Sequence, residues 1–110
     1  MKISTRRMDK TAILDIDGDV DLAHSSELRR AVLIEFCETR TEKVVLNMSG
    51  VRYMDSSGVA SLVEGLKASR DMGSRFILFG LSPIVQEVLQ ISRLLKIFEI
   101  YDTEEKALSS

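Results

Sequence analysis

The sequence predicts an α/β domain with a mixed, mostly parallel β-sheet flanked by helices. Three observations lead to this class: β-branched and apolar runs such as Lys43–Met48 and Arg75–Phe79, helical periodicity between such runs, and regular alternation of the two. Strands that alternate with helices are joined by right-handed crossovers, which make neighbouring strands parallel. The predicted order is β-β-α-β-α-β-α-β-α, in a single domain spanning residues 1–110.

The first two strands are predicted to form an antiparallel hairpin. Lys2–Met8 and Thr11–Ile16 are separated only by the polar pair Asp9-Lys10, and a two-residue gap suits a tight turn. Gly18 then ends the extended pattern.

The first helix is expected from Ser25 or Ser26 to about Glu38, with one of the two serines as its N-cap. Cys37 lies near the end of this helix, and we expect it to be a small buried hydrophobic residue. The predicted inner face consists of apolar residues at helical spacing: Leu28, Ala31, Val32 and Phe36.

The second helix follows a buried strand. Lys43–Met48 is a continuous apolar and β-branched run, which is typical of a strand covered on both faces. The helix is expected from about Ser56 to Met72, and Gly73 is a natural terminator after it. Its apolar stripe, expected to pack on the sheet, is Val59, Leu62, Val63 and Leu66.

The last part of the chain continues the alternation. Arg75–Phe79 is a buried strand, and Ser82 is the predicted cap of a third helix with Pro83 in its first turn. A short strand at Ile97–Ile100 precedes a terminal helix, Thr103–Leu108, capped by its threonine.

Composition excludes several classes of function. The net charge of −2, from 15 basic and 17 acidic residues, implies no basic face for nucleic acid. A single cysteine excludes an internal disulfide and a multi-cysteine metal cluster. The single histidine, His24, is expected to be an uninvolved loop residue. No apolar run reaches the roughly 20 residues of a membrane span, and the first residues form no signal peptide. We therefore expect a cytoplasmic protein without membrane insertion.

The acidic run Asp15–Asp21 has some features of a calcium-binding loop, but its spacing is wrong. A loop that starts at Asp15 has Val20 in the sixth position, where the sharp turn needs glycine. Its twelfth position is Ser26, where a bidentate glutamate belongs. We expect no metal here. Two interpretations remain: a solvated loop that leaves a strand, and an acidic docking patch for a basic partner.

The strongest candidate site is Asp55-Ser56-Ser57-Gly58, at the start of the second helix. First-turn N–H groups have no acceptor within a helix, and the helix dipole adds partial positive charge, so an anion such as a phosphate on a serine is stabilised there. Gly58 lacks a side chain, so another protein could approach the hydroxyl closely. The alternative is simple N-capping by Asp55 or Ser56. If Ser56 caps the helix, the hydroxyl of Ser57 is free.

A resemblance to a known family covers nearly the whole chain. Val44–Val59 closely resembles the signature of STAS domains, the family of the anti-sigma-factor antagonists. Gly18-Asp19-Val20-Asp21 resembles the family's upstream G-x-[LV]-D loop. Leu81–Pro83 and Ile91–Leu94 also resemble family segments, in the family's order. The resemblance implies the STAS fold.

The resemblance also implies a partner-switching role with no catalytic residue and no cofactor. Unphosphorylated antagonists of this family bind an anti-sigma factor that is also a serine kinase of the GHKL ATPase fold. The kinase phosphorylates the second serine of the motif, here Ser57, and the phosphoprotein is released. A PP2C-type phosphatase then removes the phosphate. The partner-binding residues implied are Asp19, Asp21, Asp55, Ser56 and Gly58.

Two other functions stay open. STAS domains also serve in anion transporters, in lipid-transport complexes and in the regulation of secretion systems. The intact Asp-Ser-Ser-Gly motif favours partner switching over the two transport roles. A small enzyme with Ser57 as nucleophile would need a base, and the motif contains none. His24 would have to fold onto it.

Overall fold

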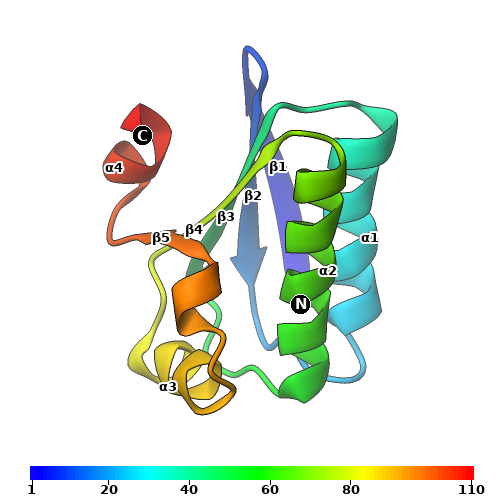
Figure 1. Cartoon of the computed structure of the whole chain (residues 1–110). Coiled ribbons are helices and arrows are strands. Elements are labelled where there is room, and N and C mark those ends of the chain that lie inside the picture. The colour runs from blue at the N-terminus through cyan, green and yellow to red at the C-terminus, as the bar shows by residue number, and fades with distance from the viewer.

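The computed structural model describes all residues 1–110 and contains one five-stranded sheet in the order β1-β2-β3-β4-β5 (Figure 1). β1 (Lys2–Met8) pairs antiparallel with β2 (Thr11–Asp17), and every other pair is parallel. The remaining strands are β3 (Lys43–Gly50), β4 (Arg75–Phe79) and β5 (Glu99–Tyr101). The predicted α/β class, the hairpin and the order of strands and helices are confirmed.

Helices cover the two faces of the sheet unequally. α1 (Ser25–Leu33) and α2 (Ser56–Asp71) lie side by side on one face, and α4 (Glu104–Ser109) packs on the other (Figure 1). α3 (Pro83–Ile91) lies at the end of the molecule where α2 begins. None of these helices has the length and apolar character that crossing a membrane requires.

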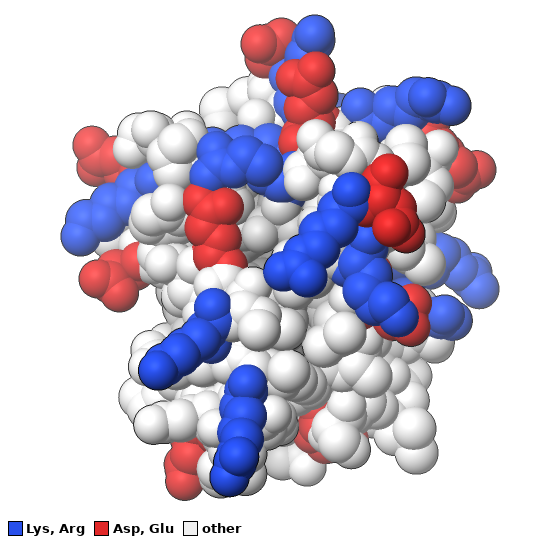
Figure 2. Space-filling view, viewed as in Figure 1, with Lys and Arg blue, Asp and Glu red and all other residues white.

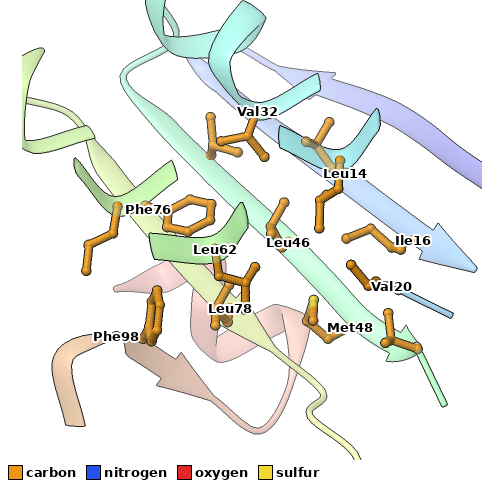
Figure 3. Close-up of a cluster of buried hydrophobic side chains, with 14 of the residues drawn as sticks. Leu14, Ile16, Val20, Val32, Leu46, Met48, Leu62, Phe76, Leu78 and Phe98 are labelled. Carbon is orange, nitrogen blue, oxygen red and sulfur yellow. The ribbon is translucent and has the colours of Figure 1, made fainter. Parts of the chain in front are cut away.

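The main core lies between the sheet and the pair of helices α1 and α2. Leu14, Leu46 and Leu78 lie in register on three neighbouring strands, and Leu62 of α2 packs over this part of the sheet (Figure 3). A smaller cluster on the other face joins α4 to the sheet through Ile13, Val45, Ile77, Phe79 and Ala107. Successive residues of β3 therefore face two different cores, as its continuous apolar run predicts.

Small side chains bring α1 and α2 close together. A Cβ atom added to Gly65 would lie 3.0 Å from both a methyl carbon of Val32 and the ring of Phe76. The predicted apolar stripe of α2 is also buried, with Val63 only partly covered. The small residues that line α2 beside this stripe are Ser61, Gly65, Ala68 and Ser69. Close contact along the helix pair fixes the N-terminus of α1 beside the N-terminus of α2.

The N-cap predicted for α1 is wrong. His24 is the N-cap, and its side chain makes no capping hydrogen bond. Ser25 is already helical and buried. The backbone explains the difference: the N–H groups of His24 and Ser25 both donate to the carbonyl of Asp21, at 3.1 and 2.8 Å, which closes a turn before either serine.

The end of the first helix also differs from the prediction. The α-helix stops at Leu33 and continues as a π-helical segment, Ile34–Glu38. The wider turn buries both Glu35 and Phe36 and leaves Cys37 exposed. The expectation of a buried cysteine is therefore wrong, because Glu35 occupies an inward position that the helical periodicity did not assign to it.

Glu35 is held by partners distant in sequence. Its two carboxylate oxygens accept hydrogen bonds from both terminal nitrogens of Arg7, at 2.8 and 2.6 Å, and from the hydroxyl of Thr41 at 2.8 Å. The hydrogen bonds to Glu35 raise the pKa of Arg7. A buried carboxylate needs such partners, and these tie β1 to the end of the first helix.

Two predicted helix caps are confirmed, and one strand boundary is wrong. Ser82 accepts from the N–H of Val85 at 3.3 Å, and Thr103 accepts from the N–H of Lys106 at 3.2 Å. The last strand begins at Glu99, because residues 95–97 form a turn of 3₁₀-helix instead.

Substitution of Leu62 by alanine tests the packing of α2. Leu62 is 0% exposed, so the change leaves a cavity under the helix and should cost about 2–5 kcal/mol of unfolding free energy. Urea unfolding at equilibrium measures this cost. Lys67→Ala, on the exposed side of the same helix, is the matched control and should change stability by about 0.5 kcal/mol or less. Equal stability of the two variants would contradict the packing described.

Candidate functional site

The candidate site lies where the parallel strands reach their carboxyl ends. The loop after β2 and the loop after β3 meet here and are joined by backbone hydrogen bonds. The N–H of Gly18 donates to the carbonyl of Gly50 at 3.0 Å, and the N–H of Val20 donates to the carbonyl of Tyr53 at 3.0 Å. Val20 also forms an isolated parallel bridge with Met54. The two loops that lead into α1 and α2 are thus held against each other by their backbones.

Asp55 is the N-cap of α2 and binds both loops. One carboxylate oxygen, Oδ1, accepts from the N–H groups of Ser57 and Gly58, at 3.0 and 3.2 Å, and from the Ser57 hydroxyl at 2.5 Å. The other, Oδ2, accepts from the N–H of Leu22 at 3.1 Å. These hydrogen bonds, chiefly the one from the Ser57 hydroxyl, lower the pKa of the Asp55 carboxyl. Of the two caps that the sequence allowed, Asp55 is the one observed.

Because Asp55 is the cap, the expectation that Ser56 caps the helix and leaves the Ser57 hydroxyl free does not hold. Ser56 is exposed and makes no capping bond. Ser57 is half-buried, and its hydroxyl is not free, because it donates to Asp55. The single proton of the Ser61 hydroxyl is shared between two carbonyl oxygens, that of Ser25 at 2.8 Å and that of Ser57 at 3.2 Å. Ser57 is thus fixed on both sides.

Gly58 has a different role from the one expected. It is buried, and a Cβ atom added to it would lie 2.5 Å from the carbonyl oxygen of Val20 and 2.7 Å from Cγ of Met54. The missing side chain lets the loop after β2 pack against the first turn of α2. The prediction that Gly58 lets another protein approach the serine hydroxyl is wrong, because the space beside Gly58 is filled by the chain itself.

The acidic residues of the predicted docking loop are separated by the structure. Asp19 is exposed, whereas Oδ1 of Asp21 lies 2.7 Å from Nδ1 of His24. His24 thus has a carboxylate partner that the sequence analysis did not foresee. Asp15 lies elsewhere on the sheet and pairs with Arg6 at 2.7 and 2.9 Å. The hydrogen bond from Arg6 lowers the pKa of Asp15. No group of three or more metal-ligating side chains forms.

Two exposed apolar side chains that the sequence analysis missed belong to the loops at the start of α2. Leu22 is 79% exposed and Tyr53 is 48% exposed. Leu22 lies on the loop after β2 and Tyr53 on the loop after β3, and hydrogen bonds of Asp55 and Val20 connect these loops. Figure 2 shows few charged side chains over the part of the molecule where α2 begins, whereas they are frequent over the opposite end. A leucine within the polar loop after β2, directly after Asp21, is the sequence signal that could have indicated this surface.

A comparison with protein families identifies the architecture. Residues 2–107 match the STAS domain. The chain belongs to the STAS domain family.

Several relatives of this STAS domain are named anti-sigma factor antagonists. It is 32% identical over 98 residues to an anti-sigma F factor antagonist of Paenibacillus polymyxa, covering 88% of this chain and 83% of the relative. The crystal structure of a putative anti-sigma factor antagonist from Thermotoga maritima aligns with a TM-score of 0.90 and 26% identity, over 97% of this chain and 92% of that one. The phosphorylated form of the Bacillus protein SpoIIAA aligns with a TM-score of 0.76 over 98% of this chain and 97% of that one. At 22% identity, the last likeness shows the fold alone.

Substitution of Gly58 by alanine tests the contact between the two loops of the STAS domain. Alanine in place of glycine ordinarily stabilises a helix by about 1 kcal/mol. Here the added methyl group would meet backbone of the neighbouring loop, so we expect a net loss of stability. Thermal unfolding measures the sign. Ser56→Ala, in the same first turn and exposed, should unfold close to the wild type, and a stabilised Gly58→Ala protein would contradict the close contact.

The lowered pKa of Asp55 predicts a pH dependence of stability. A carboxyl whose pKa is lower in the folded state stabilises the protein at pH values above its ordinary pKa, and this contribution is lost as the pH falls through the lowered value. The stability advantage of wild type over Asp55→Asn should therefore be largest near neutral pH and decline below about pH 4. Urea unfolding across this range measures it. Asp71→Asn, at the other end of α2, should show no such decline, and an advantage that grows in acid would contradict the role given to Asp55.

Proposed function

We propose that this STAS domain is an anti-sigma factor antagonist controlled by phosphorylation of Ser57. The unphosphorylated protein binds an anti-sigma factor that is itself a serine kinase of the GHKL type, and phosphorylation releases it. A PP2C-type phosphatase restores the binding form. The names of the relatives support the antagonist role. The chain acts in the cytoplasm as a substrate and a switch, and contributes no catalytic group of its own.

The hydrogen bond between the Ser57 hydroxyl and Asp55 is the observation that carries the choice of Ser57. It holds the hydroxyl in one orientation at a helix start, beside an exposed apolar surface. The Asp55 carboxylate accepts this hydrogen bond at 2.5 Å and keeps the serine oxygen in place for the γ-phosphoryl group, while the kinase supplies the catalytic groups. Ser56 has no such partner. A kinase bound at this surface therefore finds only one serine hydroxyl held in place to receive a phosphoryl group, that of Ser57.

Phosphorylation of Ser57 would add negative charge to the surface at the start of α2. The phosphate adds about −1.5 to −2 charges directly beside the Asp55 carboxylate and removes the hydroxyl proton that Asp55 accepts. Repulsion and desolvation of these charges in an interface cost a few kcal/mol, which is about a hundredfold or more in affinity. The positive end of the helix dipole favours negative charge at this position, and Ser57 lies outside the buried core, so we expect the fold to persist. SpoIIAA, whose fold this chain shares, has that fold in both its unphosphorylated and its phosphorylated form.

The loop after β2 supplies a second part of the docking surface. Asp19 is exposed, and Asp55 fixes its loop against α2 through the N–H of Leu22. A carboxylate in this position suits a basic group on the partner. We expect Asp21 to contribute less to partner binding than Asp19, because its carboxylate already contacts His24.

Mass spectrometry tests the site of phosphorylation. The kinase, of the GHKL type, is first purified from the native host by pull-down with the unphosphorylated protein. The protein is then incubated with this kinase and ATP before the phosphate is mapped. Wild type should gain one phosphate, on Ser57. Ser57→Ala should stay unmodified and still bind the kinase, because Asp55 keeps its bonds to the N–H groups of Ser57 and Gly58. Ser57→Asp should bind poorly, since it places a fixed charge in the interface.

Ser56→Ala is the matched control for this assignment, because Ser56 is exposed and is not the cap. It should be phosphorylated at nearly the wild-type rate. Phosphate on Ser56, or undiminished labelling of Ser57→Ala, would overturn the assignment. Capture of a transporter subunit in place of a kinase would favour a STAS role outside sigma-factor control.

The docking role of Asp19 is tested by its conversion to asparagine. Asp19→Asn should weaken kinase binding by several-fold and make it less sensitive to salt than wild-type binding. The unfolding temperature should stay nearly unchanged, because the side chain is exposed. Isothermal titration measures the affinity. Asp71→Asn removes the same charge at the far end of α2 and should bind like wild type. Equal losses in both variants would indicate a general charge effect and no docking contact.

A further inference from the structure

A shallow depression adjoins Ser57 in the groove between the two helices. Its volume is about 310 Å³, and both helices contribute to it. The hydrogen bond from the Ser61 hydroxyl to the carbonyl of Ser25 holds the two walls together. The polar residues that line it are Ser25, Ser26 and Arg29 of α1, with Ser57, Ser61 and Glu64 of α2.

Arg29 is the one cationic side chain in this depression. It is exposed and forms no ion pair, whereas Arg6, Arg7 and Arg75 are each paired with a carboxylate. Glu64, on the opposite wall, has no ion-pair partner either. An arginine fork donates parallel hydrogen bonds to two oxygens of a phosphate, and it is a stronger phosphate ligand than the point charge of lysine.

We propose that Arg29 binds the phosphate group once Ser57 is phosphorylated, and so forms part of a phosphoserine-binding subsite within the chain. The inference rests on the proposed modification of Ser57. Ser57 and Arg29 line the same depression, one from each helix, so a phosphate on Ser57 has Arg29 within the same groove. Arg29 draws the phosphate towards α1 and away from the Asp55 carboxylate, with which it would otherwise be in direct repulsion.

The subsite is tested without a kinase, in the full chain with phosphoserine introduced at position 57 during translation. Phosphorus NMR follows the second ionisation of the phosphate, which an ordinary phosphoserine undergoes near pH 6. A neighbouring guanidinium favours the doubly charged form, so Arg29→Gln should move the titration midpoint to higher pH by about one pH unit. Arg29→Lys should restore part of the difference, because it keeps the charge but not the fork. Glu64→Gln removes a like charge and should move the midpoint to lower pH.

Arg30→Gln is the matched control. Arg30 is the next residue of α1 and is also exposed, but it does not line the depression beside Ser57. Its titration midpoint should coincide with that of the unsubstituted phosphoprotein. A midpoint in Arg29→Gln that equals this value, or an equal shift in Arg30→Gln, would overturn the subsite. Failure of a kinase to label Ser57 would overturn the proposed function instead, and the two results are independent.

Discussion

The Asp55 carboxylate joins the parts of the candidate site. It accepts hydrogen bonds from the first turn of α2 through Ser57 and Gly58, and from the loop after β2 through Leu22. One side chain therefore caps a helix, fixes a loop and orients a serine hydroxyl. Each of these contacts stabilises the charged carboxylate, and the lowered pKa of Asp55 is their combined effect.

The same arrangement requires glycine and close backbone contact around it. The loop after β2 approaches α2 only because Gly58 has no side chain in front of the Val20 carbonyl. The exposed apolar residues Leu22 and Tyr53 lie on the two loops that meet at the helix start. A charge added at Ser57 would fall next to a carboxylate that cannot move without releasing the loop. The proposed switch therefore depends on local electrostatics and leaves the core in place.

Short-range patterns in the sequence were sufficient for much of the fold. The hairpin, the strand Arg75–Phe79 and the caps Ser82 and Thr103 follow from neighbouring residues, and they are found as predicted. The motif at residues 55–58 was located at a helix start for the same reason. Helical spacing also found the buried stripe of α2, although it did not reveal the small residues that bring α1 close.

The features that were missed depend on contacts between distant segments. Glu35 is buried because Arg7 meets it from another strand, and the π-helical segment that accommodates it exposes Cys37. The cap of α1 is decided by the carbonyl of Asp21 and by packing that buries Ser25. The pairing of Asp55 with the N–H of Leu22 spans 33 residues, so no local pattern indicates it. The candidate site could be located from the sequence, with Asp55 as one of two possible caps, but the hydrogen bonds of Asp55 to Leu22 and to the Ser57 hydroxyl could not be foreseen.

The most direct measurement is the affinity of the cognate kinase for two forms of the full chain, one with serine and one with phosphoserine at position 57. Isothermal titration with the purified kinase, in the absence of ATP, gives both values under identical conditions. Phosphoserine at position 57 should weaken binding by about a hundredfold or more, which corresponds to about 2.7 kcal/mol. Equal affinity of the two forms would contradict the proposal that the charge at Ser57 controls the exchange of partners.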